Sequence, residues 1–330
     1  MADTTSDAVR FQREQDRGRQ ASSPHQVSAR GWKDVVVRTW REMRRDNVPL
    51  LAAGVAFYAL LALVPSLVAF VSTYGLVADP SDIQRNVDDA LAAAPTEVQN
   101  LVESQLRAIV DAEPSGLRLG ALVGLVVALW SASAGMKHLI EAVNKAYGED
   151  EARGFVKLRG LALVLTVGAI VVLAVSAALL IVLPATLDDS GSQGAARTGL
   201  LIVRWPLFAA IALVGLAVIY RFAPDRQNAL WRWVSPGAVM ATVVWVIASV
   251  GFSIYTSNFS NYNETYGALG AIVVVMLWLY ITAYVIIAGA ELNAELERQT
   301  VVDSTTGPAR PLGERDAHAA DTVGESTGKR

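Results

Sequence analysis

Long apolar runs with almost no charge recur along this chain and constrain its fold more than any other feature. Each run is about 20 residues long, which is the length that a helix needs to cross the hydrocarbon core of a bilayer. Apolar residues make up 53% of the chain and charged residues only 18%, so composition agrees with the pattern. The sequence therefore predicts an all-α integral membrane bundle of six transmembrane helices, at residues 49–76, 117–135, 161–183, 199–220, 234–255 and 266–290.

Basic residues near the ends of these spans predict their orientation. The loops after the second and fourth spans are rich in Lys and Arg, with Lys137, Lys145, Arg153, Lys157, Arg159, Arg221, Arg226 and Arg232. The loop between the fifth and sixth spans contains neither residue type. Because cytoplasmic loops carry an excess of Lys and Arg, we expect a multi-pass protein of the bacterial cytoplasmic (inner) membrane with both termini in the cytoplasm.

Polar segments flank the predicted spans. Residues 1–30 and 299–330 mix charges with small polar residues, which predicts two disordered cytoplasmic tails around a membrane domain of residues 31–298. Residues 31–45 place Trp32 and Met43 on one helical stripe and Arg residues on other faces. This pattern predicts a basic amphipathic helix on the inner membrane surface, although a solvated helix packed on the protein also fits. Residues 79–114 predict short amphipathic helices on the outer face.

Several blocks of sequence carry a family resemblance. They include LWSASAGMKHLIEAVNKAYG (129–148), YRFAPDR (220–226), YTSNFSNYNETYGALG (255–270) and GAELNAEL (289–296). With these blocks in this order, residues 31–298 resemble the YihY/BrkB family of bacterial inner-membrane proteins, once labelled ribonuclease BN. The resemblance implies six membrane helices with cytoplasmic termini. Family members have been proposed as transporters or as envelope-integrity factors, and the nuclease label is regarded as a misassignment.

The residues themselves give little support to an enzyme. The chain has no Cys, which excludes thiolate metal sites and cysteine nucleophiles. A metal-dependent ribonuclease needs several His and carboxylate ligands around its ions, but the three histidines lie far apart in the sequence. His138, Glu141 and Lys145 share a helix face, which an ion pair between Glu141 and Lys145 explains. We expect no metal, no cofactor and no nucleic-acid partner, and ribonuclease is the disfavoured alternative.

A transport path would have to be lined by neutral side chains. The central parts of the spans lack charged residues, which disfavours proton coupling through a buried carboxylate. Pro65 interrupts the first span and is expected to kink it, because Pro removes a backbone hydrogen bond. The candidate path residues are Tyr58, Pro65, Ser66, Trp130, Ser131, Ser133 and Tyr280, and ordinary packing is the alternative for each.

Two further groups of residues are predicted at the two membrane faces. At the inner ends of the spans, Lys137, Arg221, Arg226, Glu291 and Asn293 form a predicted polar cluster in which Glu291 pairs with one of the three cations. A structural ion pair is favoured there over a gate. In the outer loop, Asn258, Tyr262, Asn263, Tyr266 and Gly267 could contact a sugar or a lipid headgroup.

Taken together, these patterns favour a transporter-like protein that moves a lipid, another amphiphile or a small polar solute. The alternative is a scaffold that does not transport and supports the integrity of the envelope. Membrane lipids are the expected partners, with envelope proteins as further candidates. The sequence leaves the oligomeric state open.

Overall fold

The computed structural model describes residues 14–75, 117–179, 195–257 and 268–327, and its fold is all α, as predicted. Within these residues, the extended pairing is a single isolated bridge between Ala229 and Thr305. The long helices are α2 (Ala29–Arg45), α3 (Val48–Gly75), α6 (Leu117–Tyr147), α7 (Phe155–Ala177), α9 (Ala195–Phe222), α10 (Trp231–Ser257) and α12 (Ala268–Glu297). The short ones are η1 (Gln15–Arg17), η2 (Pro24–Gln26) and α13 (His318–Asp321).

A helix lies over each of the six predicted spans, but fewer qualify as membrane spans by length and composition. Among the described residues, four helical segments qualify: Phe155–Ser176, Arg197–Phe222, Trp231–Thr256 and Ile272–Glu297. A fifth is added if α2 and the first part of α3, which meet at 64°, count as one bent span. The described residues thus support four or five membrane helices, and the number six stays a prediction.

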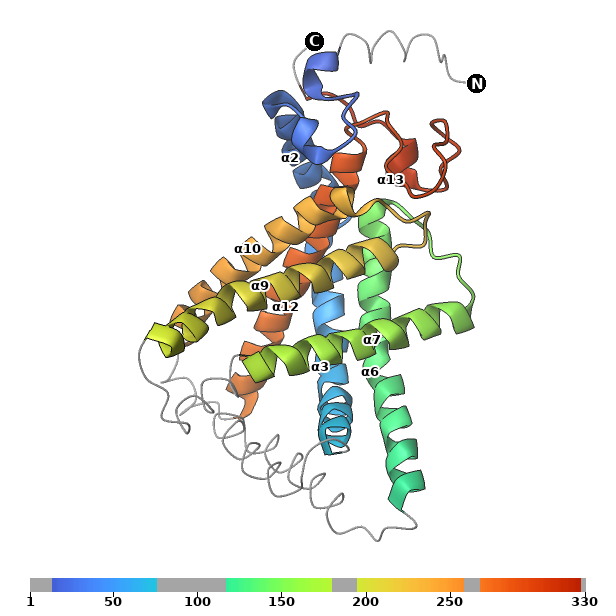
Figure 1. Cartoon of the computed structure of the whole chain (residues 1–330). Helices are drawn as coiled ribbons and strands as arrows, with labels where there is room; N and C mark the ends of the chain where they lie inside the picture. The colour runs from blue at the N-terminus through green and yellow to red at the C-terminus, as the bar shows by residue number, and fades with distance from the viewer. Residues whose placement is uncertain (1–13, 76–116, 180–194, 258–267, 328–330) are drawn as a thin grey trace.

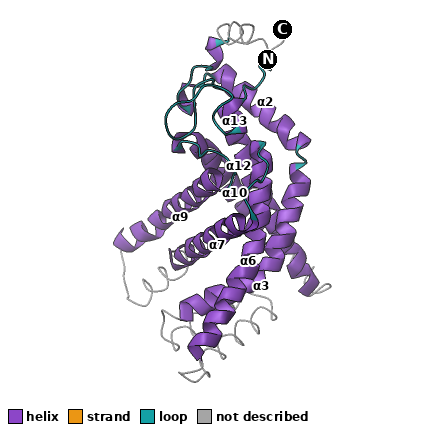
Figure 2. Cartoon of the chain, turned by 90° about the vertical axis from the view of Figure 1, so that its right-hand side faces the viewer, coloured by secondary structure: helices purple, strands orange, loops and turns teal. Residues whose placement is uncertain are grey.

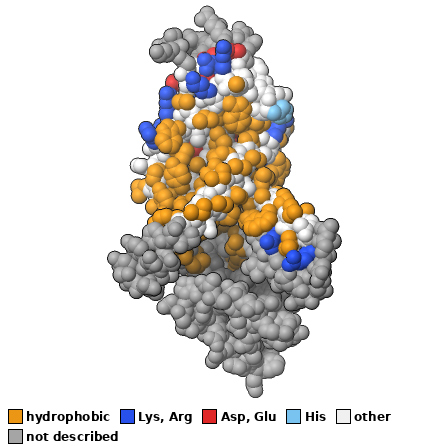
Figure 3. Space-filling model, turned by 90° about the vertical axis from the view of Figure 1, so that its left-hand side faces the viewer, with side chains coloured by type: hydrophobic (Ala, Val, Ile, Leu, Met, Phe, Trp, Pro, Cys, Tyr) orange, Lys and Arg blue, Asp and Glu red, His pale blue; other side chains and the backbone are white. Residues whose placement is uncertain are grey.

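Helix α12 lies at the centre of the packing and contacts α2, α3, α6 and α10. Helices α3 and α6 form a second close pair, while α7 and α9 extend to one side of it (Figures 1 and 2). Helices α2 and α13 lie together at one end of the bundle (Figure 1), which we call the α2 end. In Figure 3, hydrophobic side chains form a broad band on one face of the molecule, with Lys and Arg side chains above it and a smaller group at its lower right edge.

The two terminal segments are folded against each other at the α2 end. Arg19 is fully buried and donates hydrogen bonds to the carbonyl oxygens of Gln299 (3.3 Å) and Gly324 (2.8 Å). The backbone N–H of Val301 donates to the carbonyl oxygen of Arg19 at 2.9 Å. The expected disorder of residues 1–30 and 299–330 therefore does not hold for residues 14–30 and 299–327. Each segment is too polar to fold alone, but each provides hydrogen-bond partners for the other.

Two glycines let α10 and α12 cross at close range. A Cβ atom added to Gly237 would lie 2.1 Å from the carbonyl oxygen of Gly289, and one added to Gly289 would lie 2.9 Å from that of Gly237. The hydroxyl of Tyr220 on α9 reaches the same place and donates to the carbonyl of Ile286 at 2.8 Å. Small residues allow such contacts between membrane helices, so this crossing fixes the α2 ends of three helices together.

Candidate functional site

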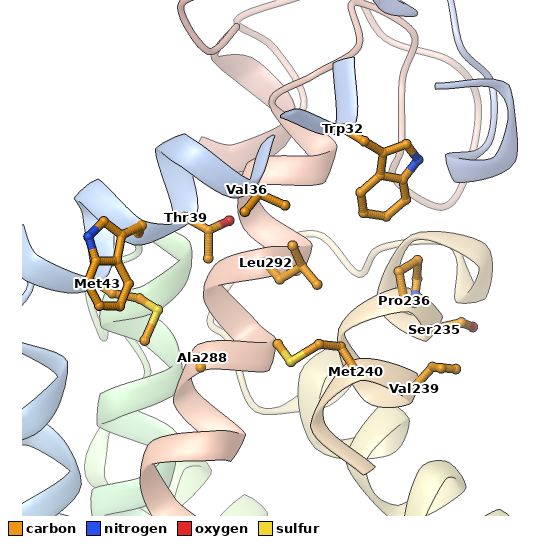
Figure 4. Close-up of a pocket in the computed structure, with 11 residues that line it drawn as sticks. Trp32, Val36, Thr39, Met43, Ser235, Pro236, Val239, Met240, Ala288 and Leu292 are labelled. Carbon is orange, nitrogen blue, oxygen red and sulfur yellow. The ribbon is translucent and has the colours of Figure 1, made fainter. Parts of the chain in front are cut away.

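An apolar groove of about 760 Å³ lies at the α2 end, with α2 on one side, α10 on the other and α12 between them (Figure 4). Its lining consists of Trp32, Val36, Thr39, Trp40, Met43, Ser235, Pro236, Val239, Met240, Ala288 and Leu292. The two hydroxyl groups are satisfied within their own helices: Thr39 donates to the carbonyl of Val35 at 2.9 Å, and Ser235 donates to that of Trp231 at 2.6 Å. The groove therefore offers an almost wholly apolar wall to an occupant.

The local sequence explains why α2 forms one wall. Ser28 caps the helix by accepting a hydrogen bond from the backbone N–H of Gly31 at 3.2 Å. Lining residues then recur at helical spacing, so they share one face. After Arg45 the chain turns at Asn47, whose φ of 55° lies in the left-handed region that Asn tolerates. This turn produces the sharp bend between α2 and α3.

The back of α2 is held by ion pairs with α12 and with the folded ends of the chain. Arg38 donates to the carboxylate of Glu295 at 2.5 Å and to the side-chain oxygen of Gln299 at 2.9 Å. Asp34 pairs with Arg17 at 2.5 Å and accepts a hydrogen bond from the backbone N–H of Thr327 at 2.9 Å. The position of the groove wall therefore depends on buried charges behind it.

A second ion pair lies on another face of α12. The two Nη atoms of Arg226 donate to the two carboxylate oxygens of Glu297 at 3.2 and 2.7 Å, and the Ser304 hydroxyl donates to the same carboxylate at 2.6 Å. The side chains of Arg226 and Glu297 are 2% and 0% exposed. Burial alone would lower the pKa of Arg226, but the carboxylate of Glu297 outweighs it and raises that pKa. The arginine thus stays charged inside the protein.

Tyr147 and Asn293 complete the surroundings of this ion pair. The ring of Tyr147 lies 5.2 Å from the guanidinium of Arg226, and burial raises the pKa of its hydroxyl. Asn293 accepts a hydrogen bond from the backbone N–H of Gly237 at 2.7 Å and donates to the carbonyl of Val234 at 3.0 Å. Together these groups join the ends of α6, α10 and α12 to the loop after α9.

The five residues of the predicted inner-end cluster are not brought together, and Glu291 does not pair with any of the three expected cations. Arg226 pairs with Glu297, Lys137 pairs with Glu141 at 3.2 Å, and the guanidinium of Arg221 lies 4.5 Å from the ring of Trp231. The reason is the helical phase of α12. At 3.6 residues per turn, Glu297 lies about 40° from Asn293 but about 120° from Glu291.

Glu291 is 1% exposed, and within the described residues its Oε1 atom has no hydrogen-bond partner. Glu291→Gln is expected to preserve the folded yield and to raise the thermal unfolding midpoint of the detergent-solubilised protein. The gain should correspond to about 1–3 kcal/mol, because the amide is never charged, whereas folding must bury the ionisable carboxyl group of Glu291. Glu295→Gln is the matched control and should lower the midpoint, since Glu295 pairs with Arg38 and Arg298. An equal decrease of the unfolding midpoint in the two variants would mean that Glu291 has an ion partner.

The predicted path residues lie around the α3–α6 contact and on α12, away from the groove lining. Tyr58 stacks on His138 with ring centroids 3.6 Å apart, and Ser133 is buried and donates to the carbonyl of Trp130 at 2.7 Å. Tyr280 lies beside Tyr284, with ring centroids 6.2 Å apart. Ser131 is half-buried on α6.

Four predictions about this path and the outer side of the membrane are not tested by the described residues. Pro65 lies inside α3, and the predicted kink stays a prediction. The side chain of Ser66 lies outside the described residues. So do the outer-loop candidates Asn258, Tyr262, Asn263, Tyr266 and Gly267, together with the segment 79–114.

The acidic partner expected for Lys145 is also different. Glu141 pairs with Lys137 and contacts His138 Nδ1 at 2.9 Å, whereas Lys145 pairs with Asp46 at 3.4 Å. In the part of the chain that the structure describes, no group of three or more His, Asp or Glu side chains is arranged to hold a metal ion.

Sequence reasoning missed the groove and the partners Arg38, Glu295 and Glu297. A signal for the groove exists in the apolar stripe of α2, but its opposite wall on α10 and α12 depends on packing between distant helices. For the carboxylates, the run AELNAELE places acids on two faces of one helix. This pattern predicts several ion partners on different sides of the helix, and not a single one.

An all-helical chain with several membrane-length helices and an apolar groove at one end defines a polytopic membrane protein. The family model described as virulence factor BrkB matches residues 39–313, and the chain belongs to this family of bacterial membrane proteins. This confirms the family resemblance.

The alignments with named relatives extend over most of each relative's length. The ribonuclease-like protein YfkH of Bacillus subtilis is 33% identical over 257 residues, which is 75% of this chain and 90% of the relative. A UPF0761 membrane protein of Pseudoalteromonas atlantica is 24% identical, covering 81% of this chain and 90% of the relative. Another UPF0761 membrane protein, from Idiomarina loihiensis, is 26% identical, covering 76% of this chain and 87% of the relative. No solved structure matches the chain.

Proposed function

We propose that this is a six-span protein of the bacterial cytoplasmic membrane, with both termini in the cytoplasm, that binds a phospholipid in the groove at the α2 end and moves it across the membrane. The role is transport and not catalysis. The groove is the observation that carries the proposal. Its position supports the orientation, because the α2 end holds the loops that are rich in Lys and Arg, and such loops favour the cytoplasmic side.

The dimensions and surroundings of the groove suit a lipid tail. Its volume of about 760 Å³ falls within the range of about 300–1,000 Å³ that is common for ligand sites. On α10 it continues onto an exposed apolar surface, where Val239 is 46% exposed and Val243 is 53% exposed. An acyl chain could therefore enter from the bilayer while the headgroup stays at the surface beside α2.

Movement of the lipid requires that one wall of the groove can shift. Helix α2 is joined to α3 through the 64° bend at Asn47, so α2 can rotate without moving the other membrane helices. Its back face is held by hydrogen bonds and ion pairs with discrete partners, so a movement of α2 requires that these partners be exchanged. These features support a moving wall against a fixed α10–α12 pair.

The test is lipid translocation in vesicles that contain the purified protein and a fluorescent phospholipid. We expect the wild-type protein to accelerate the exchange of the lipid between leaflets. Val239→Trp should reduce the rate almost to that of empty vesicles, because the indole fills the groove. Val244→Trp is the matched control and should keep the wild-type rate. Val244 lies on the same helix and is 40% exposed, but it does not line the groove.

Two outcomes would contradict the proposal in different ways. If the wild-type protein fails to move lipid but still binds it, the scaffold role replaces transport. If Val239→Trp and Val244→Trp slow translocation equally, the groove is not the lipid path.

A further inference from the structure

An apolar groove alone does not select a lipid inside a bilayer. Lipid tails outside the groove already have apolar surroundings, so burying them against Val and Met side chains brings no hydrophobic gain. Selection must then come from groups that meet the headgroup. The side chains at the rim of the groove are therefore the ones that decide its ligand.

Three cationic side chains surround this rim. On α2, Lys33 and Arg44 lie about 60° and 80° around the helix from Val36, at the edge of the lining face. The guanidinium of Arg44 lies 4.8 Å from the ring of Trp40, which itself lines the groove. On α10, Arg232 lies about 20° from Val239, in line with the lining face and one turn closer to the end of the helix than Ser235. Cations thus approach the mouth of the groove from both walls.

These three cations are also not neutralised by nearby carboxylates. In the described segments, Lys33, Arg44 and Arg232 are exposed and none of them has a carboxylate partner. By contrast, Arg38, Arg226 and Arg298 are all engaged in ion pairs with Glu residues of α12. Unneutralised positive charge is therefore present at the mouth of an apolar groove, which is the arrangement that complements an anionic amphiphile.

We infer that the groove takes an anionic phospholipid, with one acyl chain against Val239 and Met240 and the phosphate at the end of the groove where Trp32 lies beside Pro236 (Figure 4), between Lys33 and Arg232. The inference rests on the proposed function, because it names the substrate class of the same site. Each basic side chain near the membrane surface favours an anionic headgroup by about fivefold in affinity. Removal of the charges of Lys33 and Arg232 should therefore reduce the preference for an anionic lipid by about 25-fold.

The experiment measures lipid binding to the full-length protein in detergent by native mass spectrometry, which resolves each bound lipid. The probes are phosphatidylglycerol and phosphatidylcholine with identical acyl chains. We expect the wild-type protein to prefer phosphatidylglycerol, and the double variant Lys33→Gln/Arg232→Gln to lose about 25-fold of that preference. Arg41→Gln is the matched control and should keep the preference. Arg41 is an exposed cation on α2, but it lies about 140° from Val36.

Each of the other possible results contradicts one part of the proposal. Equal binding of the two lipids by the wild-type protein, still abolished by Val239→Trp, would reject the anionic preference and leave the lipid groove intact. Binding of both lipids that Val239→Trp does not weaken would reject the groove itself, and with it the proposed function. Displacement of phosphatidylglycerol by millimolar inorganic phosphate would assign the rim to a free anion instead of a lipid.

Discussion

Arg226→Met is expected to destabilise the protein by about 3–5 kcal/mol, because it leaves the carboxylate of Glu297 buried without its cation. Glu297 is fully buried, and Arg226 supplies two of its hydrogen bonds. The remaining hydrogen bond from Ser304 does not neutralise the charge. The measurement is the thermal unfolding midpoint of the detergent-solubilised protein, together with the yield of monodisperse protein.

Two controls distinguish loss of the ion pair from a general sensitivity of this end of the protein. The double variant Arg226→Met/Glu297→Met should recover most of the lost stability, since it buries no unpaired charge. Arg30→Met breaks the pair with Asp16, whose side chains are 75% and 51% exposed, and should cost only about 0–1 kcal/mol. If the double variant is as unstable as the single one, the charge interaction is not what stabilises this site.

Gly237→Ala is expected to prevent α10 and α12 from packing at all. The new methyl group would lie 2.1 Å from the carbonyl oxygen of Gly289 and 2.5 Å from the side chain of Asn293. A backbone oxygen cannot rotate away, so the helices must separate, and the hydrogen bond from Gly237 to Asn293 is lost as well. The cost should exceed the roughly 1–3 kcal/mol of an ordinary overpacked core, and we expect little folded protein by size-exclusion chromatography.

Gly251→Ala is the matched control for this effect. Gly251 lies on the same helix, and a Cβ atom added there meets nothing within 4 Å. Its replacement should therefore be neutral or stabilise the helix by up to about 1 kcal/mol. A Gly237→Ala protein with a wild-type yield and unfolding midpoint would show that the α10–α12 crossing is looser than described.

The helical fold could be predicted because hydropathy reports directly on each segment. The predicted spans coincide with helices, although α6 continues to Tyr147 and α7 begins at Phe155, beyond the apolar runs. These extensions are stabilised by partners outside the membrane core, such as Asp46 for Lys145. Hydropathy locates the apolar part of a helix, whereas its polar ends depend on which charges other helices place beside them.

The predictions from sequence fail where distant parts of the chain come into contact. Composition correctly marks the terminal segments as polar, but it cannot show that Arg19 will find carbonyl groups on residues 299 and 324. Likewise, the sequence predicts that Glu291 pairs with a cation of the inner-end cluster, but Glu291 lies on a different face of α12 from Glu297, which pairs with Arg226. Proximity to the end of a span places a side chain at the right depth, and helical phase then decides its partner.

The seating of α2 has a consequence for the order in which the protein is assembled during synthesis. Asp34 and Arg38 bind the backbone of Thr327 and Glu325, which are translated 293 and 287 residues later, respectively. One wall of the groove is therefore translated long before the residues that hold its back face. Until those residues are made, a nascent chain carries an amphipathic segment without these partners, and the membrane surface can bind its apolar face.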